Sequence, residues 1–161
     1  MKQVNPKHVK ELLDLINGAP YLDLLGIRVL DFGIGYSKVE MELLRKHLNP
    51  FGATHGGVYA SVIDVATYMA VYCELEENTG ATSIDLLVSN LSMIHEGKFI
   101  VEGKSIKIGQ SICLAEATAK DGNGKLLAHG TSKIMVLDGK QTFNHAVKAM
   151  GYRALPPKFL D

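Results

Sequence analysis

The stretch that decides the fold is Asn49-Pro50-Phe51-Gly52-Ala53-Thr54-His55-Gly56-Gly57, which runs directly into an apolar segment carrying one carboxylate, Asp64. This segment, from Gly56 to about Leu75, is apolar on nearly all sides, as is typical of a helix in a protein core. An acidic side chain in such a place is rarely buried unless it is paired or functional. The two glycines are expected to leave backbone N–H groups uncovered at the helix start, where a negative oxygen is held well. Together these features indicate a catalytic constellation.

The helix also carries a polar stripe. Ser61, Asp64 and Thr67 follow one another at intervals of three residues, which places them on one side of a helix. Such a stripe either faces solvent or lines a small polar pocket. A solvent-facing stripe normally includes Lys and Glu, and this one has neither, so the pocket is favoured.

The spacing within the segment constrains how its parts can cooperate. His55 and Asp64 are nine residues apart, which on a straight helix is roughly 13 Å of rise and about half a turn. The Gly56 N–H and the Asp64 carboxylate therefore cannot meet on one small substrate within one subunit. If they cooperate, the carboxylate comes from a second copy of the helix, antiparallel in a two-fold dimer with two identical composite sites.

The rest of the chain predicts an α+β domain in which a curved antiparallel sheet of about six strands wraps around this helix. Short turns between apolar, alternating segments indicate an antiparallel meander. Cys113, Ala115, Ala117 and Ala119 share one strand face, and such small side chains would let a helix lie close to the sheet. Extended segments are expected over residues 27–32, 37–44, 81–94, 98–108, 111–120 and 125–137.

The chain is expected to form a single domain over residues 1–138, which includes an amphipathic N-terminal helix over 6–17. Residues 139–161 form a C-terminal extension, with a possible short helix near 142–150. Leu155-Pro156-Pro157-Lys158 is expected to be a loosely attached tail.

Composition excludes several classes of function. Seventeen basic residues balance seventeen acidic ones, so neither a nucleic acid nor a membrane surface is an expected partner. The two cysteines, Cys73 and Cys113, form no metal or disulfide motif and are expected to be reduced core residues. No apolar run reaches membrane-spanning length, and we expect a cytoplasmic protein.

Several motifs of this chain together resemble those of a known family. The chain resembles the hotdog-fold acyl-CoA thioesterases, in particular the PaaI-like, phenylacetate-degradation branch of the 4-hydroxybenzoyl-CoA thioesterase superfamily. The resemblance extends from about Leu25 to Leu137. It rests on the order Asn49…Gly52…His55-Gly56-Gly57…Asp64, followed by Thr82-Ser83-Ile84-Asp85-Leu86 and Gly122-Asn123-Gly124-Lys125-Leu126-Leu127-Ala128.

The resemblance implies catalytic roles for the matching residues. Asp64 would attack the thioester carbonyl or deprotonate the attacking water, and the Gly56 N–H would stabilise the oxygen as it gains charge. Asn49 and His55 would fix the loop and help to orient the carbonyl or the water. Ser83 would assist the water near the carboxylate.

The implied substrate is an acyl-CoA, and coenzyme A is part of that substrate rather than a cofactor. We expect no metal, because a thiolate is a good leaving group, and we expect a homo-oligomer, either a dimer or a dimer of dimers. Residues expected to bind substrate are Gly57, Ser61, Thr67, Tyr68 and Thr82. The chain departs from the family pattern at Ser89-Asn90-Leu91-Ser92-Met93 and at Gly109-Gln110, so the contacts to coenzyme A stay open.

The leading hypothesis is therefore hydrolysis of an acyl-CoA thioester to a free acid and coenzyme A. The alternative is a hotdog protein that binds acyl-CoA without catalysis, although a pure binder has no need of a costly acid. A hotdog hydratase normally carries a different Asp/His arrangement on its helix. The acyl group stays open, since Tyr59, Tyr68, Met69 and Tyr72 could shape a pocket for an aromatic or medium-length chain or could simply be core.

Overall fold

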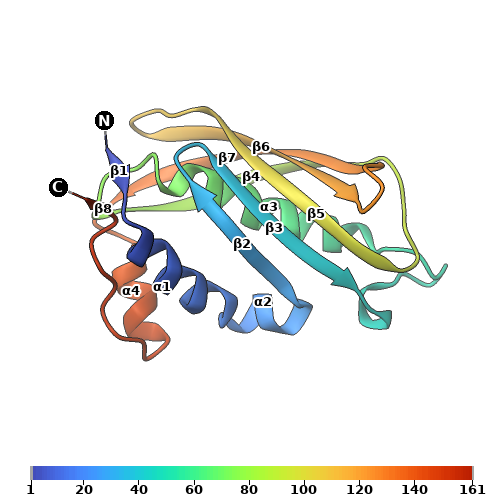
Figure 1. Cartoon of the computed structure of the whole chain (residues 1–161). Coiled ribbons are helices and arrows are strands. Elements are labelled where there is room, and N and C mark those ends of the chain that lie inside the picture. The colour runs from blue at the N-terminus through green and yellow to red at the C-terminus, as the bar shows by residue number, and fades with distance from the viewer. Residues whose placement is uncertain (1, 161) are drawn as a thin grey trace.

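Helix α3 (Gly56–Tyr72) lies at the centre of the molecule, and a six-stranded sheet curves around it (Figure 1). The arrangement comes from a computed structural model that describes residues 2–160. Val62, Ile63, Ala66 and Ala70 of α3 are fully buried, as expected for a helix that is apolar on nearly every side. The α+β class predicted from the sequence is confirmed.

The sheet is antiparallel throughout, in the order β2-β3-β5-β6-β7-β4. Its strands are β2 (Ile27–Gly33), β3 (Tyr36–Leu43), β4 (Thr79–Asn90), β5 (Gly97–Lys107), β6 (Ile112–Asp121) and β7 (Leu126–Asp138). The predicted meander is wrong at one place, because β4 pairs with β7 at the edge of the sheet instead of with β5. The chain between β3 and β4 includes the 17 residues of α3, which carry it across the sheet. Short turns join only β2 to β3 and β5 to β6 to β7.

A row of small residues crosses the sheet beneath α3. Ser37, Gly103, Ala117 and Gly130 are paired in register on β3, β5, β6 and β7. A Cβ on Gly103 would lie 2.3 Å from the Ala66 carbonyl oxygen, so α3 rests directly on the strand backbone there. The Ser37 hydroxyl donates a 2.6 Å hydrogen bond to the same oxygen. The small-residue face expected on β6 is also confirmed, since Cys113, Ala115, Ala117 and Ala119 are all buried.

Three helices cover the side of α3 that the sheet leaves open (Figure 1): α1 (Pro6–Asn17), α2 (Pro20–Leu25) and α4 (Phe143–Ala149). The Asn5 side chain caps α1 by accepting a hydrogen bond from Lys7 N. Asn17 fastens the other end of α1 to β2, since its side-chain amide bonds both the N–H and the carbonyl of Val29. Helix α4 packs on α3 through Phe143, whose ring lies edge-on to Tyr72 at 4.8 Å.

The loosely attached tail predicted at residues 155–158 is wrong. Strand β8 (Phe159–Leu160) pairs with β1 (Gln3–Val4), and Lys158 is fully buried. The Lys158 ammonium donates to the carbonyls of Tyr72, Leu75 and Glu76 at distances of 3.3, 2.9 and 2.9 Å. Carbonyls at the end of a helix have no partner within it and attract a cation, so this lysine caps α3 from a distant part of the chain.

No helix within residues 2–160 combines the length and the hydrophobicity needed to cross a membrane.

Candidate active site

The start of α3 is built by the loop in front of it. The His55 side chain caps the helix by accepting a 2.9 Å hydrogen bond at Nδ1 from Gly57 N. The Asn49 side-chain oxygen accepts from Phe51 N and Ala53 N at 2.9 and 3.2 Å, which holds the preceding turn. These side chains shape the loop, as expected of Asn49 and His55.

The two glycines at the helix start differ in their backbone N–H groups. The expectation that both are uncovered is wrong for Gly57, whose N–H is occupied by the His55 cap. The Gly56 N–H, in contrast, donates no hydrogen bond within residues 2–160. A Cβ on Gly56 would lie 2.7 Å from the side-chain amide nitrogen of Asn90, at the end of β4. The free N–H of Gly56 and the Asn90 amide therefore lie close together, at the positive end of the helix dipole.

Asp64 lies about two turns further along α3 and is half-buried. Its Oδ1 is one of two side-chain atoms in the described part of the chain that are buried without a hydrogen-bond partner, the other being His47 Nε2. Buried carboxylate oxygens nearly always have a partner, because leaving one unpaired is costly. Within residues 2–160 no group offsets the cost of burying this Asp64 oxygen.

Asp64 and polar side chains from α3 and β4 line one hollow. Tyr68 lies one helical turn away, and Thr82 and Ser83 of β4 line the same hollow as Asp64 and Tyr68. Burial, with a smaller effect of the Asp64 charge, raises the pKa of Tyr68 to about 12. The Tyr68 hydroxyl is consequently protonated at neutral pH and can donate a hydrogen bond.

The expected polar stripe is only partly present. Ser61 lines a hollow beside Asp64, although its hydroxyl already donates to Gly57 O at 2.8 Å and bonds Tyr21 Oη at 2.7 Å. Thr67 does not line the pocket: it is fully buried, and its hydroxyl donates to Ile63 O and Asp64 O. A spacing of three residues falls short of a helical turn, so the stripe rotates with each step and its third member turns into the core.

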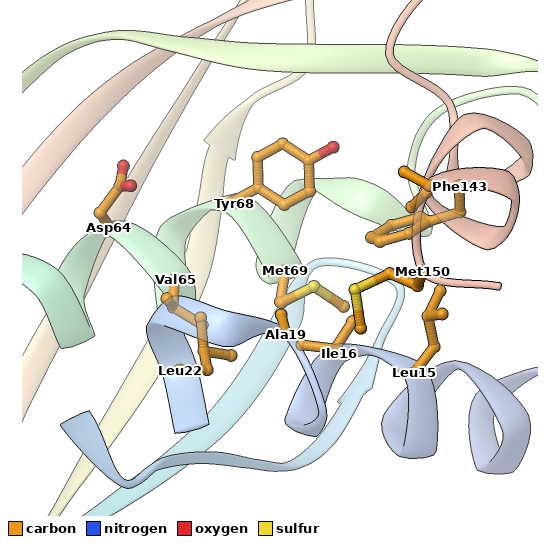
Figure 2. Close-up of a pocket in the computed structure, with 12 residues that line it drawn as sticks. Leu15, Ile16, Ala19, Leu22, Asp64, Val65, Tyr68, Met69, Phe143 and Met150 are labelled. Carbon is orange, nitrogen blue, oxygen red and sulfur yellow. The ribbon is translucent and has the colours of Figure 1, made fainter. Parts of the chain in front are cut away.

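An apolar cavity of about 370 Å³ opens beside Asp64 (Figure 2). Sequence reasoning missed most of its walls, because they come from α1, α2 and α4. The apolar face of α4, with Phe143, Val147 and Met150 at helical spacing, is the one signal that could have indicated it. The residues lining the cavity are Leu15, Ile16, Ala19, Leu22, Asp64, Val65, Tyr68, Met69, Phe143, Ala146, Ala149 and Met150.

The structure thus gathers the predicted site residues into two groups. Asp64, Tyr68, Thr82 and Ser83 lie together, whereas Asn49, His55, Gly56 and Gly57 lie at the start of the helix. Gly56 and Asp64 are separated by about 12 Å of helix rise. Within residues 2–160 no three His, Cys, Asp or Glu side chains gather as a metal site would require.

Comparison with known proteins places this site in a family. A family model described as "Thioesterase superfamily" matches residues 51–128, which include the start of α3 and Asp64. A protein of Saccharolobus solfataricus, provisionally described as an esterase, is 30% identical over 120 residues, covering 74% of this chain and 79% of that protein. The chain belongs to the thioesterase superfamily. The membership inferred from the motif is thereby confirmed.

Other members of the superfamily extend the comparison. Mouse acyl-coenzyme A thioesterase 13 is 28% identical over 93 residues, covering 56% of this chain and 66% of the mouse protein. A crystal structure of a Haemophilus influenzae thioesterase superposes with a TM-score of 0.76 at 21% identity, over 82% of this chain and 92% of that one. At this identity the superposition shows the fold alone, and it confirms the hotdog fold of the superfamily.

Proposed function

We propose that this protein hydrolyses acyl-CoA thioesters to a free carboxylic acid and coenzyme A, with Asp64 as its catalytic carboxylate. The observation that carries the proposal is Asp64 Oδ1, a buried and unpartnered oxygen beside an apolar cavity. The relative described as an acyl-coenzyme A thioesterase supports the choice of substrate.

The reaction can proceed by either of two routes. In one route, Asp64 removes a proton from water as the water oxygen attacks the thioester carbon. The carbon–sulfur bond then breaks, and the proton passes to the departing thiolate. In the other route, the carboxylate itself attacks the carbon and the carbon–sulfur bond breaks, which expels coenzyme A as the thiolate and leaves a mixed anhydride. Water then hydrolyses the anhydride to the free acid and the Asp64 carboxylate, and the proton released passes to the thiolate. Both routes place negative charge on the thioester oxygen, which the free Gly56 N–H would stabilise. Ser83 and Thr82, which line the same hollow as Asp64, would orient the water.

Because Gly56 and Asp64 of one chain are about 12 Å apart, we propose that each site combines Gly56 of one protomer with Asp64 of another. Strand β4 offers a suitable interface. It is the last strand of the sheet, paired on one side only, and its Ile84 and Leu87 side chains are 48% and 71% exposed. An unpaired edge with apolar side chains favours the addition of another strand. A dimer is the smallest assembly that completes the site.

The proposal is tested by replacing Asp64 with Asn or Ala and measuring thiol release from a panel of acyl-CoA substrates. Loss of a general base or nucleophile should lower kcat by roughly 10²–10⁴-fold, while the thermal unfolding temperature stays near that of the wild type. Asp14→Asn, at an exposed carboxylate on α1, is the matched control and should keep full activity.

Near-normal turnover in both Asp64 variants would refute the catalytic role. Binding of acyl-CoA by the wild-type protein with no thiol release from any substrate would instead favour the non-catalytic alternative.

A further inference from the structure

The cavity beside Asp64 has one polar end and one apolar end. In Figure 2, Asp64 lies at one end of the cavity, next to Val65 and Leu22. Phe143 and Met150 of α4 lie toward the opposite end, with Met69 between. A group attached to a carbonyl held near Asp64 would therefore extend along α3 toward α4.

The lining of the cavity restricts what can enter it. Within the described chain, Asp64 is the one charged side chain among the lining residues, and the others are aliphatic, thioether or aromatic apart from the Tyr68 hydroxyl. Among the lining residues that the structure describes, none is a cation that could pair with a second carboxylate at the far end of an acyl group. Burying such a charge unpaired would be strongly unfavourable, so dicarboxylic acyl groups are excluded.

The volume of the cavity sets an upper size. About 370 Å³ accommodates roughly twelve groups the size of a water molecule or methylene, at about 30 Å³ each. This is within the usual range for a small-molecule pocket. An acetyl group would leave most of the space unfilled and would gain little from apolar burial.

We propose that this cavity receives the acyl part of the substrate, that the acyl group is uncharged and apolar with up to about twelve carbon atoms, and that α4 forms the wall limiting its length. The inference rests on the proposed thioesterase function and names its substrate class. The C-terminal segment that includes α4 lies outside the region matched by the family model. On this inference, that segment selects the acyl group.

The test narrows the cavity from α4. Ala146 lines the cavity and is only half-buried, so Ala146→Trp adds bulk there without displacing a buried side chain. Lys148→Trp introduces the same residue at an exposed position of the same helix and is the matched control. Because one methylene in an apolar pocket changes kcat/KM by about 10-fold or more, Ala146→Trp should lower kcat/KM for decanoyl-CoA at least 10-fold. Its kcat/KM for acetyl-CoA should stay within twofold of the wild type.

The outcomes separate this inference from the proposed function. Suppose that the wild type releases thiol but Ala146→Trp leaves the chain-length preference unchanged, or lowers kcat/KM equally for all substrates. The cavity is then not the acyl site, and the inference is overturned. If Ala146→Trp does not fold, Ala149→Leu provides a gentler narrowing at an exposed lining position, with the same expected direction. Faster turnover of succinyl-CoA than of decanoyl-CoA by the wild type would also overturn it.

A binding measurement keeps the inference testable even if no acyl-CoA is hydrolysed. Calorimetry with S-decyl-coenzyme A, a thioether that carries the chain and cannot be hydrolysed, should show binding to the wild type and to Lys148→Trp, and at least 10-fold weaker binding to Ala146→Trp. Equal binding to all three proteins would overturn the inference, whatever the thiol-release assay shows.

Discussion

Replacing Gly103 with Ala should destabilise the protein strongly, although it adds a single methyl group. The new Cβ would lie 2.3 Å from the Ala66 carbonyl oxygen and 2.5 Å from Ser37 Oγ, whereas ordinary contact begins near 3.4 Å. The Ala66 oxygen belongs to the backbone of α3 and cannot rotate away. Helix α3 must therefore lift from the sheet by about 1 Å, or β5 must bend by as much.

The size of the effect follows from what this shift removes. A gap of 0.5–1 Å forfeits a quarter to a half of the dispersion energy of the contacts that it opens. The buried hydrogen bond from Ser37 to Ala66 O is also lost or lengthened, which is worth about 1 kcal/mol. Overpacking alone typically costs about 1–3 kcal/mol. We expect the free energy of unfolding to fall by about 3 kcal/mol.

Urea unfolding at fixed protein concentration measures this loss. Gly122→Ala is the matched control, because a Cβ at that position would have no atom within 4 Å of it and the backbone there does not require glycine. That variant should lie within about 0.5 kcal/mol of the wild type or be slightly more stable. A loss below 1 kcal/mol for Gly103→Ala would refute the close contact between α3 and β5. The same shift moves Asp64, two residues from Ala66, and a misplacement of 1 Å can lower catalysis by about 100-fold.

Three further predictions concern α3 and the lysine that contacts its end. Gly56→Pro removes the backbone N–H of the first residue of α3, a helix position where proline is tolerated. Proline requires an extended conformation of the residue before it, and His55 already has one, with φ −66° and ψ 133°. Gly56→Pro should lower kcat by about 10²–10³-fold, while Gly56→Ala, which keeps the N–H, should lose far less; equal losses would exclude the N–H as the reason. Gly56→Pro and Asp64→Asn chains that are refolded together in equal amounts should recover about a quarter of wild-type activity. Half of the dimers are then mixed, and each mixed dimer has one intact site out of two. No recovery would mean that the site is not shared between protomers. Finally, burial lowers the pKa of Lys158 to about 8 from 10.5, so between these values the unfolded chain binds more protons than the folded one. The free energy of unfolding of the wild type minus that of Lys158→Met, measured with urea, should therefore rise by up to about 1.4 kcal/mol per pH unit between pH 8 and 10. A difference that stays constant or falls over this range would contradict the prediction.

The elements of the fold were largely predictable because their signals are local. The apolar run from Gly56 and the alternating segments after it depend on neighbouring residues only, and each became the expected helix or strand. The place of β4 was not predictable in this way, since its pairing with β7 joins residues that are 38 to 59 positions apart. Residues 91–96, between β4 and β5, form no hairpin, and the length of this connection does not show that β4 pairs with β7.

The sequence pointed to a candidate site where a residue type has few structural reasons to be present. Asp64 in an apolar helix and a glycine at the helix start have few structural explanations, so both stood out. Lys158 did not, because a lysine near a chain end normally faces solvent. Here the carbonyls of Tyr72, at the end of α3, and of Leu75 and Glu76, just after it, hold the Lys158 ammonium. The cavity walls were missed for a related reason: apolar residues on α1 and α4 look like ordinary core until the helices are placed.

The row of small residues beneath α3 also affects how this protein can change during evolution. On the sheet side, Gly103 and Gly130 leave no room for a larger side chain, so substitutions there disturb the whole domain. On the opposite side, half-buried or exposed positions such as Ala146 and Ala149 border the cavity and can vary in size without moving α3. A mutational library confined to α4 should therefore yield folded proteins with altered substrate preference at high frequency. One confined to the strand positions under α3 should yield mostly insoluble chains.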